Sequence, residues 1–232
     1  MSERPDITAF VQSLTGSGVA VAAMDIGHTK GALFPQENAA IARATKARKQ
    51  EFTTGREAAR LAMRRLGVTP TEIPMGADRA PVWPKGLRGS ISHSGDICVA
   101  VLARSSTFQS LGIDIEADAP LDDDLLDTIC TGNEQRWLLT QDADARGKLA
   151  KLMFSAKECA YKCQYPLSLD MIDFMAFEIS LDLEKHRFDA KFTRPVGPFT
   201  AGTRFLGHYG AAFGSFATTI CLPAPKIATF RD

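Results

Sequence analysis

An apolar segment with two acidic residues, SLGIDIEAD, places the strongest constraint on the fold of this chain. Leu111, Ile113 and Ile115 alternate with the other residues, which predicts a β-strand with one face in a hydrophobic core. Asp114 and Glu116 lie two positions apart, so both carboxylates project from the same face of the strand. Two interpretations remain open. The strand either has a charged outer face at a sheet edge, or ends in a cleft where a hard cation offsets the repulsion between the carboxylates.

Helical segments followed by strands occur in each half of the chain, which predicts an α+β fold with two similar lobes. The proline- and glycine-rich residues 69–90 are expected to form a long loop, and such loops are often functional. Strands are predicted at 18–26, 89–94, 97–103, 177–183, 187–192 and 216–222, and helices at 35–66, 131–139 and 146–164, the last ending before Pro166.

The helical pattern from 35 to 66 is interrupted by TGRE, which matches a capping box with Thr54 as N-cap and Glu57 reaching back to it. A second box, with Thr131 as N-cap, opens the 131–139 helix. Arg56 would then lie at a helix N-terminus, where free N–H groups and the helix dipole favour a phosphate. On spacing alone, however, a solvated basic helix face is the better supported interpretation of this segment.

The segment FSAKECAYKC carries a second group of charges on a predicted helix. Glu158 and Lys162 lie four residues apart and therefore share one helix face. This pair is either an ordinary surface ion pair or a third metal carboxylate with two lysines close by, Lys157 and Lys162. A capping box formed by Ser155 and Glu158 is disfavoured, because the apolar stripe of the helix begins well before Ser155.

The segment GSISHSGD ends a predicted strand after the long loop. Ser92 and His93 there could present a hydroxyl and an imidazole to a phosphate, although a lone histidine is more often structural. The chain contains neither a GxxxxGK[ST] phosphate loop nor a GxGxxG segment, so the common nucleotide-binding folds are disfavoured. A GxSxG nucleophile elbow is also missing from the sequence.

Composition limits the partners and the compartment. The 232 residues carry a formal net charge of zero, so nothing in the overall charge indicates a nucleic-acid partner. The apolar run GVAVAAM is too short to span a bilayer and has no basic flank before it, so no membrane contact is expected. The five cysteines include no CxxC pair and are expected to be small buried hydrophobic residues rather than a zinc site, which favours the reducing cytoplasm.

The order of four segments resembles the Sfp-type 4′-phosphopantetheinyl transferases, in particular their siderophore-synthase (enterobactin-type) branch. The segments are FTTGREAARLAMRRLG, PVWPKGLRGSISHSGD, LGIDIE and FSAKECAYK, and the similarity covers about residues 43–165. This resemblance implies an enzyme that transfers the 4′-phosphopantetheine arm of coenzyme A to a serine of an apo-carrier protein, acyl, aryl or peptidyl, and releases adenosine 3′,5′-bisphosphate. It also implies two α+β lobes, at 1–112 and 113–232, with coenzyme A in the cleft between them.

The resemblance implies Mg²⁺ as cofactor, with Mn²⁺ as a second candidate since both prefer oxygen ligands. It assigns Asp114, Glu116 and Glu158 as metal ligands. Glu158 is the first candidate for the general base, with Asp114 and a neutral Lys162 as alternatives. The implied coenzyme A contacts are Ser92 and His93 at its phosphates, Arg48 and Arg56 at its 3′-phosphate, Lys162 at the reacting phosphate, Lys157 in a less defined role, and Arg79 in place of a lysine that relatives carry where this chain has Met75.

The implied partners are the apo-carriers of fatty-acid, polyketide or non-ribosomal peptide synthesis, and the family analogy favours a monomer. The apolar loop 166–177 is a candidate carrier contact, and packing in the core of the second lobe is an equally supported interpretation. Two other functions remain as alternatives: a non-catalytic module that binds coenzyme A or a carrier, and a magnesium-dependent phosphohydrolase. The complete set of three acidic residues and Lys162 argues against the non-catalytic module.

Overall fold

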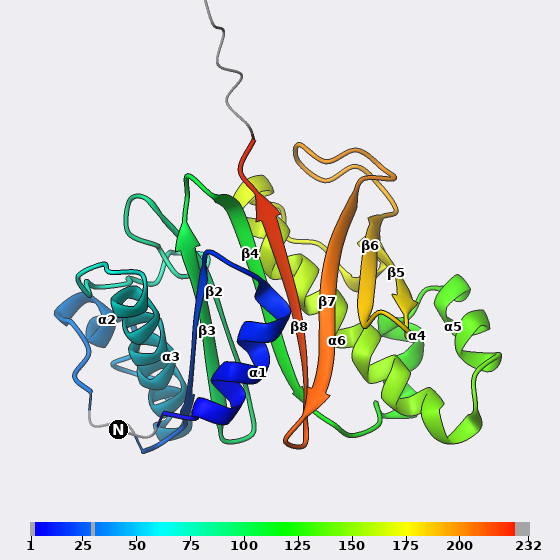
Figure 1. The fold of residues 1–232 in the computed structure, drawn as a ribbon, viewed down its shortest axis with the longest axis horizontal. Coiled ribbons are helices and arrows are strands. Elements are labelled where there is room, and N and C mark those ends of the chain that lie inside the picture. The colour runs from blue at the N-terminus through cyan, green and yellow to red at the C-terminus, as the bar shows by residue number, and fades with distance from the viewer. Residues whose placement is uncertain (1–2, 29–30, 226–232) are drawn as a thin grey trace, which may run out of the picture.

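Two antiparallel sheets form the framework of the protein (Figure 1). The computed structural model describes residues 3–28 and 31–225. The smaller sheet has the strand order β1 (Val19–Asp25), β3 (Ile97–Arg104), β2 (Leu87–Ser94). The larger sheet has the order β4 (Phe108–Ala117), β8 (Ser215–Pro223), β7 (Arg204–Ala212), β6 (Arg187–Phe192), β5 (Phe177–Asp182).

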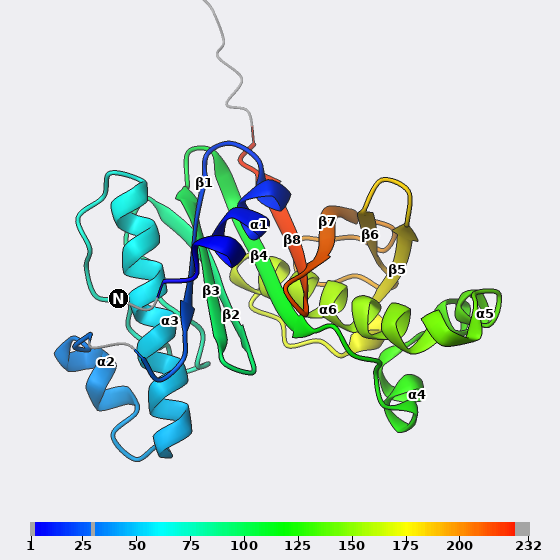
Figure 2. The same ribbon diagram turned by 60° about the horizontal axis from the view of Figure 1, so that its bottom comes forward.

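Each sheet carries one long helix on one face (Figures 1 and 2). α3 (Lys46–Arg65) packs on the smaller sheet, and α6 (Ala143–Ser168) packs on the larger one. α1 (Pro5–Thr15) packs against β1 of one sheet and β7 and β8 of the other. The short elements are α2 (Pro35–Ala40), η1 (Asp123–Leu125), α4 (Leu126–Ile129), α5 (Gly132–Leu139) and η2 (Phe174–Ala176). This mixture of helices and antiparallel sheets confirms the predicted α+β class.

Strands β1 and β3 are buried on both faces, which explains why their sequences are continuously apolar rather than alternating. Alanines and a methionine of α3 cover one face of these strands. Ile7 and Val11 of α1, together with the apolar side chains of β4, cover the other face. The apolar face of β4 predicted from its sequence therefore closes the core between the two sheets.

Strands β2 and β4 belong to different sheets, yet they lie side by side. Serine hydroxyls bridge them: the backbone N–H of Ile113 donates to Ser90 Oγ, and that of Ile115 donates to Ser92 Oγ, each at 3.3 Å. These serines alternate along β2 with side chains on the opposite face. The joint between the sheets therefore consists of small polar side chains, and it leaves room for a cavity beside them.

Most of the predicted elements are confirmed. The strands at 18–26, 89–94, 97–103, 110–118, 177–183, 187–192 and 216–222 all correspond to strands of the structure. The capping box of α5 is also confirmed, since Thr131 Oγ1 accepts from the Glu134 N–H at 3.3 Å and the Thr131 N–H donates to Glu134 Oε2 at 2.6 Å. The predicted domain boundary between residues 112 and 113 falls within β4, and the division into two domains stays a prediction.

The predicted helix start at Thr54 is wrong. The helical segment is instead interrupted earlier, between α2 and α3. Thr45 caps α3 by accepting a hydrogen bond from the Arg48 N–H at 3.3 Å. Thr54 lies in the middle of α3, where its hydroxyl donates to the carbonyl of Gln50 at 2.8 Å. Arg56 is therefore not at a helix N-terminus, and it is buried rather than part of a solvated face. A T-x-x-E pattern occurs by chance within a helix, and only the packing around it decides whether a helix begins there.

The predicted end of α6 before Pro166 is also wrong, because the helix continues to Ser168. Pro166 lies in the last turn, so its missing N–H removes only one helical hydrogen bond close to the end. Leu169 then ends the helix in the left-handed conformation, with φ of 58°. Further elements were not predicted from the sequence, among them α1, α4 and β7.

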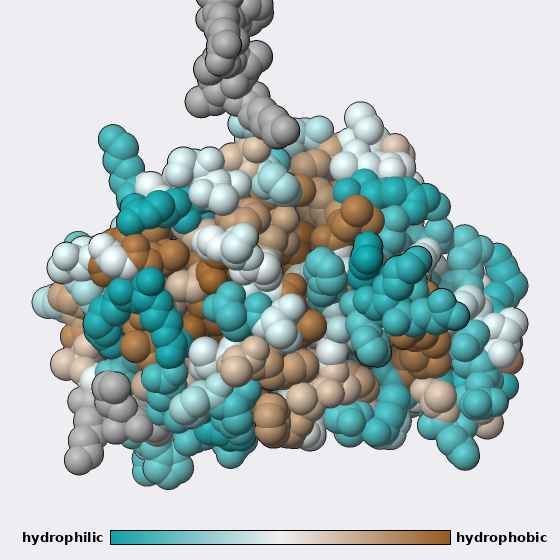
Figure 3. Space-filling model, in the orientation of Figure 1, coloured by the Kyte–Doolittle hydropathy of each residue, from teal (hydrophilic) through white to brown (hydrophobic). Residues whose placement is uncertain are grey.

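The surface of the molecule is mixed in character. Figure 3 shows hydrophilic side chains over much of the face seen in Figure 1, with hydrophobic side chains between them. Among residues 3–28 and 31–225, we find no helix whose length and apolar character would allow it to cross a membrane.

Candidate active site

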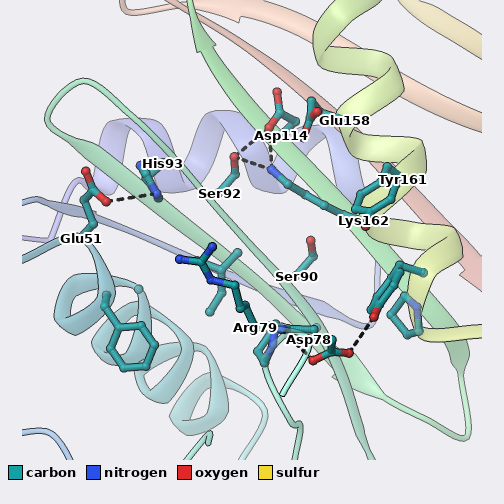
Figure 4. Close-up of a pocket in the computed structure, with 18 of the residues that line it drawn as sticks. Glu51, Asp78, Arg79, Ser90, Ser92, His93, Asp114, Glu158, Tyr161 and Lys162 are labelled. Carbon is teal, nitrogen blue, oxygen red and sulfur yellow. Dashed lines mark hydrogen bonds and ion pairs between the residues drawn. The ribbon is translucent and has the colours of Figure 1, made fainter. Parts of the chain in front are cut away.

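A cavity of about 480 Å³ opens where α3, β2, β4, α6 and the loop before β2 meet (Figure 4). It lies between the two sheets, beside the serine-bridged joint of β2 and β4. Lys157 is the single predicted site residue that does not line it. The predicted residues that do are Arg48, Arg56, Arg79, Ser92, His93, Asp114, Glu116, Glu158 and Lys162.

Ser92, Asp114 and Lys162 form a hydrogen-bonded cluster in this cavity (Figure 4). Ser92 Oγ donates to Asp114 Oδ1 at 2.8 Å, and Lys162 Nζ donates to Asp114 Oδ1 at 2.7 Å and to Ser92 Oγ at 2.9 Å. Burial alone would lower the pKa of Lys162, but the charge of Asp114 and the hydrogen bond to it outweigh burial and raise this pKa. Lys162 is therefore held as a cation on a carboxylate from the neighbouring strand.

Glu158 lies one helical turn before Lys162, and Figure 4 shows its side chain next to Asp114. Burial raises the pKa of the Glu158 carboxyl, the negative charges of Asp114 and Glu116 add to this effect, and Lys162 opposes it. The structure thus brings the three acidic residues into one cavity. The positive charge of Lys162 does not fully offset the burial of Glu158 and its repulsion by the other two carboxylates.

The third acidic residue, Glu116, has a partner that the sequence analysis missed. Lys151, two helical turns before Glu158 on α6, forms an ion pair with Glu116 at 2.7 Å. Both side chains are largely buried, with 18% and 19% of their surface exposed. Helix periodicity places Lys151 on the same face as Glu158, so the spacing contained a signal for it.

The acidic residues fit a hard cation chemically, although lysines now neutralise two of them. Within residues 3–28 and 31–225, the structure contains no group of three or more His, Cys, Asp and Glu side chains arranged to hold a metal ion. Asp114 Oδ2, however, is buried and has no hydrogen-bond partner. A buried carboxylate oxygen without a partner is costly unless something binds it, and three carboxylates are the donor set that Mg²⁺ prefers.

The outer part of the cavity is basic. Arg48 Nη1 lies 3.4 Å from His93 Nε2 and forms an ion pair with Glu51 at 3.1 Å. Burial lowers the pKa of His93, and the positive charges of Arg48 and Lys162 lower it further, while Glu51 opposes them. His93 is therefore a neutral hydrogen-bonding group near neutral pH, and Arg48 supplies the positive charge at this end.

Arg56 is a buried cation in the wall of the cavity. Its Nε donates to the carbonyl of Ile73 at 2.7 Å, and its guanidinium lies over the ring of Phe52, 4.1 Å from the centroid. Burial lowers the pKa of Arg56 to about 10, Glu37 opposes this shift, and Arg60 and Arg48 add to it. Arg56 therefore stays charged near neutral pH, and an anion in the cavity would relieve the cost of burying it.

Several cavity residues were missed because they carry no charge motif. Aromatic side chains contribute much of the apolar lining, and two of them, Tyr161 and Tyr165, lie three residues after Glu158 and Lys162 on the same face of α6. Helical spacing could have found these two tyrosines. Other lining residues that the sequence analysis did not assign to the site include Glu51, Phe52, Asp78, Trp83, Phe154 and Met171.

Lys157 points away from the cavity and into the core between α6 and the larger sheet. Its Nζ donates to Glu134 Oε2 at 2.7 Å and to the carbonyl of Ile129 at 2.6 Å, and its side chain is fully buried. Glu134 also accepts from the backbone N–H of Ile179 at 2.6 Å. Adjacent residues of a helix point about 100° apart, so Lys157 cannot share the face of Glu158. This position does not support a contact between Lys157 and coenzyme A.

Family models match part of each sheet. The family model described as the 4′-phosphopantetheinyl transferase N-terminal domain matches residues 36–103, and that of the 4′-phosphopantetheinyl transferase superfamily matches residues 110–212. The chain is 38% identical over 197 residues to 4′-phosphopantetheinyl transferase Svp from Streptomyces mobaraensis, which covers 83% of this chain and 80% of that protein.

Two further relatives support the same similarity. The chain is 31% identical over 195 residues to 4′-phosphopantetheinyl transferase PptT from Mycobacterium tuberculosis, which covers 82% of this chain and 86% of that protein. It is 39% identical over 127 residues to enterobactin synthase component D from Escherichia coli K12, which covers 53% of this chain and 58% of that protein. Enterobactin-type proteins are thus among the relatives, as the resemblance of the four segments indicated.

Proposed function

This chain belongs to the 4′-phosphopantetheinyl transferase superfamily, and we propose that its reaction takes place in the cavity between β2, β4 and α6. The protein is an enzyme that transfers phosphopantetheine to carrier proteins, with coenzyme A as the substrate that fits this family. The observation that carries the proposed location is the cluster of Ser92, Asp114 and Lys162, with Glu158 beside it. It places opposite charges and an unpartnered carboxylate oxygen at one point of the cavity.

The basic residues of the cavity are proposed to bind the phosphates of coenzyme A. Lys162 faces the reacting pyrophosphate, and Ser92 and His93 donate hydrogen bonds beside it. Arg48 and Arg56 bind the 3′-phosphate. This assignment gives the buried guanidinium of Arg56 the anion that it lacks among the described side chains, apart from the more distant Glu37. Arg79, from the loop before β2, adds one further positive charge to the cavity.

Asp114, Glu116 and Glu158 are proposed to hold Mg²⁺, or Mn²⁺, with Asp114 Oδ2 as the buried oxygen that is already free to bind it. The metal, when bound, neutralises negative charge on the pyrophosphate during phosphoryl transfer. Lys151 is the counter-ion of Glu116 in the structure, in an ion pair of 2.7 Å. Lys162 is the counter-ion of Asp114, also at 2.7 Å.

Glu158 is proposed as the general base. The carrier serine oxygen attacks the β-phosphorus, its proton passes to the Glu158 carboxylate, and the bond to adenosine 3′,5′-bisphosphate breaks. The raised pKa of Glu158 makes it a better proton acceptor than an ordinary carboxylate. Lys162 is the weaker candidate, because its raised pKa disfavours the neutral form that a base requires. Asp114 is weaker as well, since its Oδ1 already accepts two hydrogen bonds and its Oδ2 is the oxygen proposed to bind the metal.

A Glu158→Gln substitution tests this role, because glutamine keeps the shape of the side chain but cannot accept the proton. We expect kcat to fall by about 100-fold or more with coenzyme A and Mg²⁺ both saturating. Circular dichroism of both proteins controls for folding. Full rate in the variant at saturating Mg²⁺ would rule out Glu158 as the base.

Mass spectrometry of an apo-carrier incubated with the enzyme, coenzyme A and Mg²⁺ tests the proposed reaction. We expect the carrier to gain the phosphopantetheine arm and adenosine 3′,5′-bisphosphate to appear in equal amount. A phosphohydrolase would instead release inorganic phosphate, and a non-catalytic module would leave the carrier unchanged. Carriers of fatty-acid, polyketide and non-ribosomal peptide synthesis, tested side by side, would identify the preferred partner.

The enzyme is proposed to act as a monomer in the cytoplasm. All the residues proposed for catalysis and for coenzyme A binding come from one chain, so the site needs no second copy. The five cysteines are free thiols, and four of them are buried, which fits a reducing compartment. Light scattering during size-exclusion chromatography measures the mass of the active species directly.

A further inference from the structure

A short turn within the long loop before β2 is ordered by its own backbone. The N–H of Val82 donates to the carbonyl of Pro74, and the N–H of Gly76 donates to that of Ala80, both at 2.8 Å. The N–H of Arg79 closes the tip of this turn by donating to the carbonyl of Gly76 at 2.9 Å. Residues 74–82 therefore form a compact unit, called the 74–82 turn below.

Asp78 at the tip of this turn uses its two carboxylate oxygens in two directions. Oδ1 accepts from the N–H of Ala80 at 3.0 Å, inside the turn. Oδ2 accepts from the hydroxyl of Tyr165 on α6 at 2.8 Å. A side chain at position 76 would place its Cβ only 2.5 Å from Asp78 Oδ1, so this arrangement needs Gly76. Asp78 thus links the turn, which directly precedes β2 of the smaller sheet, to α6, which packs on the larger sheet.

Tyr165 is well placed to hold this link. It lies one helical turn after Lys162, and its ring stacks on that of Tyr161 at a centroid distance of 5.7 Å and an interplanar angle of 29°. Two aromatic rings packed together lose little freedom when the hydroxyl bonds to Asp78. The helix that carries Glu158 and Lys162 therefore also anchors the turn on the other side of the cavity.

Arg79 follows Asp78 and adopts a left-handed backbone conformation, with φ of 69°. This conformation is unfavourable for a residue other than glycine, and it persists only where its surroundings enforce it. Figure 4 shows Asp78 and Arg79 pointing in different directions, and both line the cavity. The hydrogen bond between Tyr165 and Asp78 therefore also fixes the backbone of Arg79, and with it the direction in which the Arg79 side chain leaves the turn.

We propose that Tyr165 and Asp78 are positioning residues that hold the 74–82 turn across the cavity, so that Arg79 meets the bound anionic substrate. The inference rests on the proposed binding of coenzyme A in this cavity. In this proposal, the hydrogen bond between Tyr165 and Asp78 affects substrate affinity and not the rate of the chemical step. Loss of the hydrogen bond lets the turn swing away from α6, and Arg79 then contributes less to binding.

The variant Tyr165→Phe removes only the hydroxyl of this link. We expect KM for coenzyme A to rise about threefold to tenfold, as the loss of one hydrogen bond of this kind predicts, with kcat within about twofold of the parent enzyme. Tyr209→Phe is the matched control, since the Tyr209 hydroxyl donates to the carbonyl of Asp182, outside the cavity, at 3.4 Å. It should leave both kinetic constants unchanged.

Arg79→Ala shows whether Tyr165 acts through Arg79. We expect Arg79→Ala to raise KM, and Tyr165→Phe to raise it no further in that background. An equal, additional rise in the double variant would overturn the positioning role, as would an unchanged KM in Tyr165→Phe alone. Asp78→Asn keeps one oxygen acceptor and should raise KM less than Asp78→Ala.

Hydrogen exchange separates this inference from the proposed function. In the enzyme without substrate, Tyr165→Phe should speed amide exchange at Gly76, Arg79 and Val82, whatever ligand the cavity binds. Unchanged exchange at these amides would overturn the link itself. Faster exchange together with failure of the parent enzyme to modify any carrier would preserve the link and refute the proposed function.

Discussion

Arg56 indicates a binding site because its buried guanidinium has no carboxylate hydrogen-bonded to it among the described residues. Its side chain is buried, its one hydrogen bond to a described residue uses Nε, and burial lowers its pKa to about 10. The carboxylate of Glu37 is paired with Arg60 instead, since it accepts two hydrogen bonds from Arg60 Nη1, at 2.8 and 2.9 Å. A buried guanidinium with little compensation is unfavourable in the free protein, and a phosphate in the cavity removes that cost.

Arg56→Ala should therefore weaken the binding of coenzyme A by about 10- to 100-fold, the loss expected for a charge-assisted bond. Binding of 3′-dephospho-coenzyme A should change little, because this ligand lacks the phosphate that Arg56 is proposed to hold. Isothermal titration calorimetry measures both. The control is Arg64→Ala on the exposed part of the same helix. Equal losses for the two ligands would contradict the assignment.

At the residue scale, the sequence predicts those site residues whose spacing places them on one face. Asp114 and Glu116 follow from the strand period, and Glu158 and Lys162 follow from the helix period. The pairing of Glu116 with Lys151 could not be predicted, because it depends on how α6 packs against β4. The same is true of Lys157, whose buried partners lie on α4 and α5.

Helix α6 carries two different functions on two faces. Glu158 and Lys162 face the cavity, and the adjacent Lys157 is locked into the core on Glu134. Glu134 in turn caps α5 and accepts from the N–H of Ile179 in β5. The ion pair therefore joins α6 to α5, and through Glu134 to β5, at the level of Glu158, and it holds the face proposed to be catalytic against the cavity.

Lys157→Met should destabilise the protein by about 3–5 kcal/mol, because it leaves the buried Glu134 carboxylate without its cation. Adding Glu134→Gln should recover part of the loss, since the double variant contains no uncompensated buried charge. Urea unfolding measures both effects. Lys148→Met provides the control, because Lys148 lies on the same helix in a half-exposed ion pair with Asp118 worth at most about 1 kcal/mol. A loss no larger than that of the control would show that the buried pair is dispensable.

At the element scale, the sequence predicts the strands and α5 well, because their apolar periods and capping residues are local signals. It fails where local signals conflict with packing. The capping pattern at Thr54 lies inside α3, whose alanines at 58, 59 and 62 pack on β1 and β3. Pro166 is tolerated within α6 because it lies in the last turn. The burial of β7 alternates along the strand because Phe205 and Tyr209 on one face pack in the core of the larger sheet.

The whole molecule depends on β4, which joins the two sheets. Its apolar side chains pack with those of β1, β3 and α1 in one continuous core. Its other edge pairs with β8, and its free N–H groups reach Ser90 and Ser92 on β2. The cavity proposed as the active site therefore lies at the joint, and its geometry holds only while both sheets are folded. We infer that the two halves unfold as one cooperative unit.

Ser90→Ala tests this cooperativity, because it leaves the buried N–H of Ile113 without a partner and should cost about 1–3 kcal/mol. The two tryptophans report on different halves: Trp83 packs on the core of the smaller sheet, and Trp137 packs on that of the larger one. In single-tryptophan variants, the urea transitions of both reporters should coincide, and Ser90→Ala should move both by the same amount.

The matched control for this substitution is Ser94→Ala, at the less buried end of the same strand, where the serine side chain donates to none of the described residues. It should shift neither transition by more than about 0.5 kcal/mol. A shift confined to Trp83 would show that the sheets unfold separately. In that case β4 would not couple the two walls of the cavity, and substrate bound between them would have to supply that coupling itself.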